Sequence, residues 1–367
     1  MPDTRRLTTA NGVDLLMDAT SVFGLLADLA TWPQLFDEVV HTEVLEDEST
    51  RQLGRIWSVT EGRPHAWTST RRLDWARRSI TFQRVEPVEP IAFTYGEWHV
   101  VDRGSGRCRV LLRQDFTAEV RDDEQYERLQ EQLGAAAVGQ LHALRSSVHT
   151  GSGHADLQFE VRATTVLPFG PRRPDAIAQL ARPELWTRLP HVRSAEAHGA
   201  HGLWNAGGHR VTVLKLDRVD PDGGSAQRQQ MQIVLPPTTF RLDKPETPDP
   251  EKLEPEQLEP EELESDHPEP DHLERVTHEL VFKELDPPPS VAAHTGRWSV
   301  RAIAADKALV TVRHTVTLDA VGVFAQFGAD VTLTQARQQV RDAVLTEDEL
   351  LLDGLRDLVV PDAEEPT

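Results

Sequence analysis

Short stretches in which apolar and polar residues alternate recur along this chain, and they predict strands. Loops rich in Gly, Pro or charge separate them, as in antiparallel hairpins. In the first half these stretches are VVHTEVLE, RIWSVTEG, HAWTSTRRLD, SITFQRVE, AFTYGEWHVV and CRVLLRQDFTAEV. Apolar residues at helical spacing predict a helix over 18–36, interrupted by Pro33, and a long helix over 122–148.

The second half repeats the order of the first. GEWHV at 96–100 returns as GRWSV at 296–300, and flanking residues match at the same offset, for example Phe82 and Phe282. A helical segment, PDAIAQLARPELWTRL, precedes the second set of strands, and a long helix over 332–359 follows them. This self-similarity predicts an internal duplication.

Two domains are expected, 1–152 and 153–367, because a chain of 367 residues is long enough for two cores. In each, an antiparallel sheet with one apolar face and a long amphipathic helix must bury these faces against each other. The predicted fold class is α+β, with a curved sheet wrapped around the C-terminal helix of each domain. Such an arrangement often leaves a cavity between sheet and helix, where small molecules bind.

The strand HAWTSTRRLD carries the main candidate chemistry. Alternation places its apolar members on the inner face, and polar residues accompany them there. The inward set is His65, Trp67, Ser69, Arg71 and Leu73. A guanidinium facing a cavity can bind and polarise carbonyl or enolate oxygens. An equally open alternative is a structural arginine that pairs with a carboxylate or reaches solvent.

Other polar residues are expected on inner faces. Gln114 points inward in VLLRQDFTAE, and His314 takes the corresponding place in ALVTVRHTVTL. A buried histidine is more often a hydrogen-bonded core residue than a catalyst, and His278 falls under the same alternative. The second half has no Trp-x-Ser-x-Arg strand, and its nearest arginine is Arg275 in LERVTHEL. The tryptophans, including Trp32, Trp98 and Trp298, are core residues or flat walls for a planar ligand.

Composition narrows the possible partners. A net charge of −21 argues against nucleic acid. The lone Cys108 excludes an internal disulfide and favours a reducing, cytoplasmic compartment. No apolar run is long enough for a membrane span, and the N-terminus lacks the apolar core of a signal peptide. Acidic residues and prolines crowd the segment 243–272, which we interpret as a solvated low-complexity loop inserted into the second domain.

Common motifs for metal or nucleotide chemistry are missing from the sequence. It contains no HExxH, CxxC, P-loop or GxSxG motif. The glycines of GSGRC at 104–108 fit a hairpin tip better than a dinucleotide-binding loop. The sequence therefore predicts neither a metal nor a cofactor.

Several segments resemble one family. They are ATWPQLFDEVVHTEVLE, RRLDWARRSITFQRVE, GEWHV followed by VLLRQDF, and AAHTGRW. These segments and their tandem order resemble the two-domain aromatase/cyclases of bacterial aromatic (type II) polyketide synthesis. That family belongs to the START/Bet v 1-like helix-grip superfamily, so the resemblance implies tandem helix-grip domains.

The resemblance also implies an activity. Family members receive a poly-β-ketone chain tethered to an acyl carrier protein, close its first ring by an intramolecular aldol reaction and assist dehydration to an aromatic ring. The single-domain members carry an inward Trp-x-Ser-x-Arg strand, which Trp67, Ser69 and Arg71 match. By this resemblance Arg71 stabilises the oxyanion. Trp32 and Trp98 match family aromatics near the pocket.

The sequence departs from the family at three places. Val39 replaces a tyrosine, Gln114 replaces a common histidine, and GAAAVGQL in the closing helix replaces a common Asn-Ser pair. The general acid/base is therefore unassigned, and a water polarised by Ser69 or His65 could serve.

Two alternatives to a cyclase with an active first domain stay open. The chain could be a non-catalytic carrier of a hydrophobic small molecule, although an inward Arg71 beside Ser69 favours chemistry. Alternatively, one domain is structural, and His278 and His314 keep the second domain in consideration as the active one. The expected partners are the acyl carrier protein and other type II polyketide synthase components, without nucleic acid or membrane.

Overall fold

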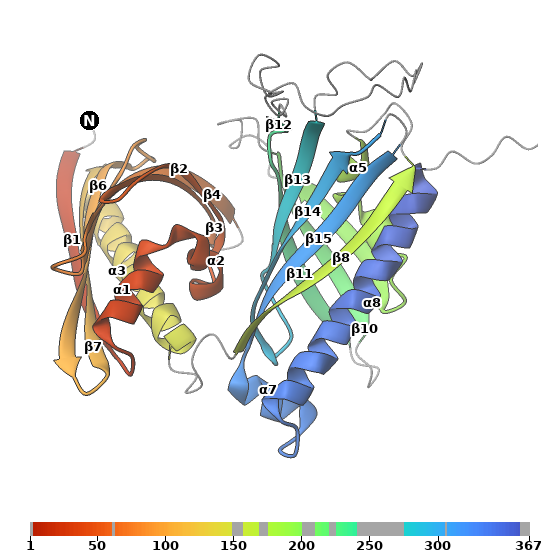
Figure 1. Ribbon diagram of the computed structural model, residues 1–367. Coiled ribbons are helices and arrows are strands. Elements are labelled where there is room, and N and C mark those ends of the chain that lie inside the picture. Colours follow the sequence, from red (N-terminus) through yellow and green to blue (C-terminus); the bar gives the residue numbers. More distant parts are fainter. Residues whose placement is uncertain are drawn as a thin grey trace, which may run out of the picture.

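The computed structural model (Figure 1) describes residues 3–60, 63–148, 157–168, 175–199, 210–219, 225–240, 275–304 and 307–359. It contains two antiparallel sheets, one built by each half of the chain. The boundary expected at 152/153 and the acidic segment 243–272 lie outside the described residues. Within them, no helix is both long and apolar enough to cross a membrane.

The first sheet has the strand order β1-β7-β6-β5-β4-β3-β2. Its strands are β1 (Asp3–Leu15), β2 (Val39–Glu48), β3 (Arg51–Thr60), β4 (Arg63–Asp74), β5 (Ser79–Arg84), β6 (Ile91–Gly104) and β7 (Arg107–Val120). The helices of this half are α1 (Ala19–Ala27), the 3-10 turn η1 (Leu29–Thr31), α2 (Trp32–Leu35) and α3 (Asp123–Val148). The sheet curves around α3, and α1 and α2 close one end (Figure 1).

The second sheet has the order β8-β15-β14-β13-β11-β10-β9, with β12 paired to β13. Its strands are β8 (Gln158–Pro168), β9 (Val192–Gly199), β10 (Arg210–Val219), β11 (Ser225–Val234), β12 (Thr238–Phe240), β13 (Arg275–Glu284), β14 (Val291–Ala302) and β15 (Lys307–Leu318). Its helices are α5 (Asp175–Leu180), α6 (Pro183–Trp186), α7 (Ala320–Phe327) and α8 (Leu333–Val359). The sheet packs along α8 (Figure 1). The predicted fold class, a sheet wrapped around a C-terminal helix in each of two domains, is confirmed.

The duplicated GxWxV segment has the same structural role in both domains. Gly96 pairs with Phe82 across β5 and β6, and Gly296 pairs with Phe282 across β13 and β14. A Cβ on either glycine would lie 2.2 Å from the Cζ atom of that phenylalanine. Each glycine therefore leaves room for an aromatic ring that lies directly over the neighbouring backbone. The tryptophan of each segment is buried in the core of its domain.

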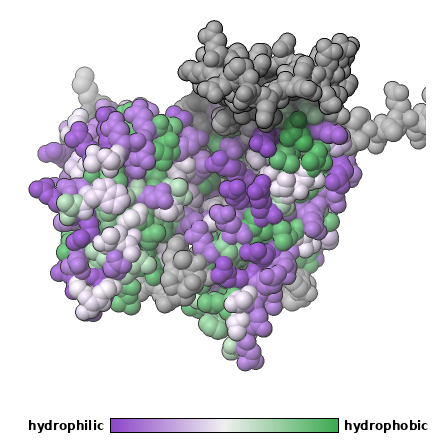
Figure 2. Space-filling view, in the orientation of Figure 1, coloured by the Kyte–Doolittle hydropathy of each residue, from purple (hydrophilic) through white to green (hydrophobic). Residues whose placement is uncertain are grey.

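The sequence pattern missed the edge strands β1 and β8. In β1 the buried side includes Thr9 and is followed by the pair Asn11 and Gly12, so apolar alternation is weak. Pairing to β7 over the whole length of β1 makes up for this weak local signal. On the face shown in Figure 2, hydrophilic residues cover much of both domains, with smaller hydrophobic patches between them.

Candidate active site

Arg71 lies on the inner face of β4 and is only 2% exposed. Its Nη1 donates to the Ala27 carbonyl oxygen at 3.1 Å and to Gln52 Oε1 at 2.7 Å, and its Nη2 donates to the Leu26 carbonyl oxygen. Those two carbonyls belong to the last residues of α1, where a helix leaves carbonyl groups without intrahelical partners. Alternation predicted the inward position of Arg71 but not these partners. The three bonds use three of its five N–H groups.

Trp32 begins α2 and faces the Arg71 guanidinium. The guanidinium carbon lies 5.1 Å from the Trp32 ring centroid, and the ring Nε1 donates to the Leu26 carbonyl oxygen at 3.2 Å. The tight path between the helices follows from the sequence: the Asp28 side chain accepts from the Ala30 amide, and Pro33 occupies the start of α2. Trp32 and Arg71 are thereby attached to the same helix end.

Burial and neighbouring carboxylates shift the pKa of Arg71 in opposite directions. Burial lowers the pKa of Arg71 to about 10, while Asp28 and Asp47 partly oppose this. The guanidinium therefore keeps its charge at neutral pH. A buried cation of this kind strongly attracts an oxyanion because the surrounding dielectric constant is low.

Arg84 is a second inward cation, which the sequence analysis did not single out. It lies at the end of β5 opposite Ser69, and its guanidinium carbon lies 4.5 Å from the Trp67 ring centroid. Burial lowers its pKa. The alternation of Ile80, Phe82 and Arg84 indicates this inward position, because strand partners of an inward residue also point inward.

The inner face of the first domain opens to solvent near Arg84. Trp67 and Phe82 pack against the core cluster but stay partly exposed. An inward aromatic ring is partly exposed only where the interior is accessible. A small cavity of about 70 Å³ at this end of the sheet is lined by residues of β5, β6 and their connection, including Arg84 and Thr94.

The other predicted residues of the first domain have different surroundings. The Ser69 hydroxyl is buried and donates to the Gln83 carbonyl oxygen at 3.2 Å. Gln114 is half-buried on the inner side of β7, where Thr9 Oγ1 donates to its Oε1 at 3.4 Å. Trp98 is 3% exposed and belongs to the core. His65 lies near the start of β4 and is exposed.

In the second domain, β11 is the counterpart of β4. Ser69 pairs with Arg84, and Gln230 pairs with Glu284 at the same place in the other sheet. The Trp-x-Ser-x-Arg positions are therefore occupied by Arg228, Gln230 and Gln232.

The second domain also repeats, at the end of α5, the hydrogen bonding that Arg71 and Trp32 make at the end of α1. Gln232 Nε2 lies 3.5 Å from the Leu180 carbonyl oxygen, and Trp186 Nε1 donates to the same oxygen at 2.9 Å. An uncharged amide thus occupies the place of the Arg71 guanidinium.

Three of the remaining second-domain candidates lie on β13, the neighbour of β11, and on β14 beyond it. Arg275 starts β13 and pairs with Phe240, so it is not on the strand equivalent to β4. His278 lies further along β13, and burial lowers its pKa. Trp298 is 1% exposed in the core.

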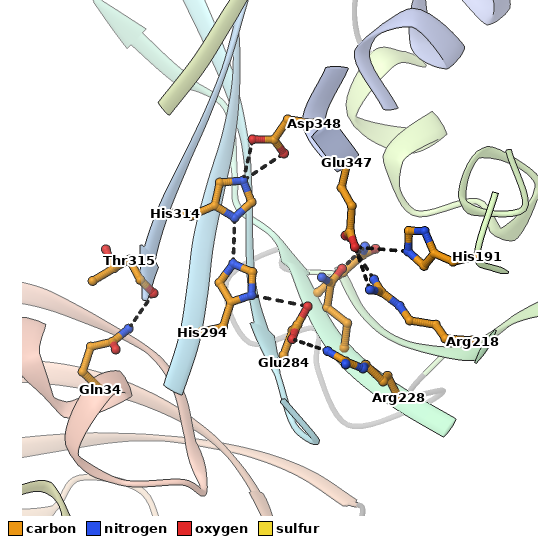
Figure 3. A network of polar contacts seen from close by, with 12 residues as sticks. Gln34, His191, Arg218, Arg228, Glu284, His294, His314, Thr315, Glu347 and Asp348 are labelled. Carbon is orange, nitrogen blue, oxygen red and sulfur yellow. Dashed lines mark hydrogen bonds and ion pairs between the residues drawn. The ribbon is translucent and has the colours of Figure 1, made fainter. Parts of the chain in front are cut away.

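His314 belongs to a buried chain of four polar side chains (Figure 3). His314 Nε2 lies 2.9 Å from Asp348 Oδ1 on α8, and its Nδ1 lies 2.8 Å from His294 Nε2. His294 Nδ1 lies 3.3 Å from Glu284 Oε1. Strand alternation predicted the inward position of His314 but gave no sign of its association with His294, Glu284 and Asp348, which come from two other strands and a helix.

This series of four side chains has only one consistent distribution of protons when both of its carboxylates are ionised. Each carboxylate can only accept, so the ring nitrogens that face Glu284 and Asp348 must both carry protons. One further proton lies between His294 and His314. Three protons on four ring nitrogens give the pair one net positive charge.

Neighbouring charges favour that protonated state. Burial opposes a charge on His294, but Glu284 and more distant carboxylates outweigh it and raise the pKa of His294. Burial likewise opposes ionisation of Glu284, yet His294, Arg218 and Arg228 lower its pKa to about 2. Arg218 in turn donates to Glu347 at 2.8 Å.

Two observations concern possible ligand sites elsewhere in the molecule. A groove of about 500 Å³ between β1 and α3 is bordered by Asn11, Asp14, His142 and Arg145. In the part of the chain that the structure describes, no three His, Cys, Asp or Glu side chains are arranged to hold a metal ion.

Comparison with known proteins gives consistent matches. The family described as polyketide cyclase/dehydrase and lipid transport matches residues 17–123. The chain is 26% identical to the granaticin polyketide synthase bifunctional cyclase/dehydratase of Streptomyces violaceoruber, over 88% of this chain and 85% of the relative. It is 28% identical to the actinorhodin polyketide synthase bifunctional cyclase/dehydratase of Streptomyces coelicolor, over 89% and 88%.

Two further matches bear on the family and the fold. A putative polyketide cyclase of Streptomyces halstedii is 33% identical over 25% of this chain and 80% of the relative. Among solved structures, the di-domain ARO/CYC BexL from the BE-7585A biosynthetic pathway has a TM-score of 0.71 and 23% identity. That alignment covers 97% of this chain and 99% of BexL.

Two antiparallel sheets, each packed along a long C-terminal helix, define the class of tandem helix-grip proteins. Within that class, the chain belongs to the polyketide cyclase family and has the tandem arrangement of the two-domain aromatase/cyclases.

Proposed function

We propose that this protein is an aromatase/cyclase that acts on a poly-β-ketone chain tethered to an acyl carrier protein. It folds the chain, catalyses the aldol reaction that closes the first ring and promotes dehydration to an aromatic ring. One observation carries the proposal: a charged guanidinium, Arg71, lies inside the first domain against Trp32 and keeps two N–H groups beyond its three bonds to the protein.

The reaction requires stabilisation of negative charge on oxygen. A methylene between two ketones loses a proton readily, and the resulting enolate carbon attacks a distant carbonyl carbon. A carbon–carbon bond forms, and the attacked oxygen becomes an alkoxide that takes up a proton. Loss of water then removes that hydroxyl together with a proton from the adjacent carbon. Arg71 and Arg84 supply fixed positive charge for these oxygens, which is the contribution that usually dominates such catalysis.

Selectivity requires one folded conformation of a flexible chain. Trp67 and Phe82 are partly exposed on the inner face, and Trp32 lies beside Arg71. Flat aromatic surfaces favour a substrate whose reacting part becomes planar, and they exclude water from it. In this proposal the rings select the folding pattern and the guanidinium groups stabilise the charge.

Proton transfer is assigned to a water molecule in the pocket. The Ser69 hydroxyl donates its proton to the Gln83 carbonyl, so its oxygen lone pairs can accept from a water. His65, near the start of the same strand, is an alternative holder for that water.

The first domain is the proposed catalytic one. In the second domain Gln232 occupies the position of Arg71, so the corresponding oxyanion donor carries no charge. The proposed partners are the acyl carrier protein and other components of a type II polyketide synthase. A cytoplasmic location is part of the proposal and is supported by the single, buried Cys108.

The decisive experiment adds the purified protein to a minimal polyketide synthase and identifies the first-ring products. An aromatic first ring, formed at the expense of spontaneously cyclised shunt products and over many turnovers, supports the proposal. Unchanged products contradict it. If shunt products remain bound to the protein in stoichiometric amounts, the protein is instead a carrier of hydrophobic molecules.

A further inference from the structure

Helix α2 of the first domain is bound directly by the second domain. Gln34 Nε2 donates to Thr295 Oγ1 at 2.6 Å and to the Thr315 carbonyl oxygen at 3.3 Å. Thr317 Oγ1 donates to Gln34 Oε1 at 2.8 Å. These bonds lie on the outer face of β14 and β15, and Figure 3 shows Gln34 on the opposite side of β15 from His314. The amide thus uses both its donor and its acceptor atoms on the second domain.

Lys283 makes a second connection to the same segment. Its Nζ donates to the carbonyl oxygens of Pro33 at 2.8 Å, Phe36 at 2.8 Å and Val39 at 2.9 Å. The side chain is 3% exposed. Burial lowers the pKa of Lys283 to about 8, so at pH 7 the ammonium form with three N–H donors prevails. All three donors are used, and all three acceptors lie between α2 and the start of β2.

An apolar cluster surrounds these polar contacts. Val40 and Trp57 of the first domain pack with Met231, Ile233 and Val281 of the second. Because these residues exclude water, the bonds of Lys283 and Gln34 are stronger than the same bonds at an exposed surface. The segment held in this way is fixed in position.

That segment carries the aromatic residues of the proposed site. Trp32 faces Arg71 at 5.1 Å, and Phe36 packs edge-on against Trp32 with ring centroids 5.2 Å apart. The ring centroids of Phe36 and Trp98 lie 6.2 Å apart. Lys283 binds the carbonyl of Phe36 itself and the carbonyl of Pro33, which directly follows Trp32.

The duplication shows that this contact is not a general property of the fold. Lys283 corresponds to Gln83 at the same offset along β5, and Gln83 is exposed. Gln34 corresponds to Arg188, which forms an exposed ion pair with Asp357 at 2.7 Å. Among the described residues, buried bonds of this kind therefore hold the α2 segment of the first domain but not its counterpart in the second domain.

We propose that Lys283 and Thr317 are positioning residues for the Arg71 site. Through them the second domain holds α2, and with it Trp32 and Phe36, in the arrangement that the first-domain reaction needs. The catalytic part of this statement rests on the proposed function above. The second domain thus contributes to the reaction of the first domain without supplying a group that touches the substrate.

A direct test of positioning needs no substrate. Amide hydrogen exchange is followed over residues 28–40 in Lys283→Met and in Lys215→Met, a control that removes an exposed lysine of β10. Exchange in this segment should become about tenfold faster in Lys283→Met and stay unchanged in the control. Thr317→Val removes one hydroxyl at similar volume, and we expect a smaller acceleration in the same direction. Equal exchange in Lys283→Met and in the wild-type protein would overturn the proposal.

A second test separates positioning from a merely structural role. With the minimal synthase, Lys283→Met should lower the ratio of aromatic to shunt product by about tenfold. In an Arg71→Lys background the same change should have an effect of less than about twofold, because both changes act on one unit. Lys283→Arg should recover part of the loss. Fully additive effects of Lys283→Met and Arg71→Lys would contradict positioning.

The two proposals fail in different ways. If the wild-type protein yields no aromatic ring, the proposed function is wrong, and the exchange experiment still decides whether Lys283 holds α2. If the wild-type protein yields the ring but Lys283→Met yields the same ratio, the function stands and the positioning role is wrong.

Discussion

Arg71 has a structural role and a proposed catalytic role, and both depend on the same guanidinium. It satisfies the carbonyl oxygens at the end of α1, and it is the proposed oxyanion donor. The first role fixes the guanidinium in position, so no reorganisation is needed when charge develops in the second. Any substitution of Arg71 should therefore change both stability and catalysis.

We expect Arg71→Ala to lower the rate of aromatic product formation by about 10²–10³. It should also lower the free energy of unfolding by about 1–3 kcal/mol, because the Ala27 carbonyl and Gln52 lose the bonds that Arg71 donates, whereas the Leu26 carbonyl keeps the bond from Trp32. Arg71→Lys keeps the charge without the forked geometry, so it should be intermediate in both measurements. Product analysis and urea unfolding check this, with Arg103→Ala, an exposed arginine of β6, as the control. A normal product distribution in Arg71→Ala would assign the chemistry to other residues.

Gly296 provides a test of packing rather than chemistry. A Cβ at this position would lie 2.2 Å from Phe282 Cζ, so Gly296→Ala forces the ring or the strand to move. The expected loss of unfolding free energy is about 1–3 kcal/mol. Gly139→Ala is the matched control, because Gly139 lies in α3 and, apart from its own stretch of helix, no atom lies within 4 Å of the added methyl group. That change should stabilise the protein by about 0.5–1 kcal/mol, since alanine favours a helix. Chemical unfolding of both variants would show whether the two substitutions change the unfolding free energy in opposite directions.

Alternation predicted the inner-face positions of several candidate residues, although His65, from the same predicted set, is exposed near the start of β4. It placed Ser69, Arg71 and His314 on inner faces, where the structure buries all three. It could not predict their partners, because Gln52 and Asp348 are remote in sequence from the residues that they bind. The catalytic roles assigned to the candidate residues stay predictions.

At the level of elements, the long acidic segment obscured the correspondence between the two sheets. It separates β12 from β13, so Arg275 was the nearest arginine in sequence to the expected position. The strand equivalent to β4 is β11, which precedes that segment. Its inner face carries Arg228, Gln230 and Gln232, and a run of polar residues gives no apolar alternation to recognise.

The acidic segment itself is expected to be dispensable for folding. Phe240 pairs with Arg275, so the chain leaves and re-enters the sheet at neighbouring positions. Deleting 243–272 leaves a four-residue connection, which suits a hairpin. We expect the melting temperature to change by no more than about 2–4 °C. A large drop in thermal unfolding would show that the segment packs against the domain.

The attachment of α8 to the second sheet should depend on pH through His294. Its pKa is raised in the folded protein, whereas an unfolded histidine titrates near about 6.5. The folded state therefore binds this proton more tightly, and the stabilisation is complete below about pH 6.5. It is lost as the pH rises through the raised value.

The unfolding free energy of the wild-type protein, relative to His294→Gln, should thus fall as the pH rises above about 6.5 and through the raised pKa of His294. Measuring the difference between the two proteins cancels the titration of other groups. His142→Gln, which replaces an exposed histidine of α3, should give no such trend. A difference that is constant over this range would refute the assigned proton.

For the whole molecule, the sequence predicted two similar domains but not how they meet. The contact uses Lys283, Thr295 and Thr317, which are polar residues on the outer faces of strands. In a sequence pattern such residues indicate a solvated face. Only the neighbouring domain shows that Lys283 and Thr317 are buried and that Thr295 is half-buried.

Breaking the contact should uncouple the unfolding of the two domains. Ile233 is fully buried in the apolar cluster between them, and Ile233→Asp places an unpaired carboxylate there. We expect the unfolding curve to separate into two transitions, which scanning calorimetry would resolve. Val166→Asp is the control, because Val166 on β8 is 47% exposed and should leave a single transition. One unchanged transition in Ile233→Asp would mean that the domains do not depend on this cluster.

The hydrogen bond between His294 and His314 also provides a natural spectroscopic probe. A proton held between two imidazole rings and shielded from bulk water exchanges slowly, so it should give a proton resonance far downfield of the backbone amides. Its chemical shift will depend on how the charge is shared between the two rings, and hence on any molecule that approaches them. A single signal from the unlabelled protein would then report whether the interior of the second domain is reached during a turnover in the first.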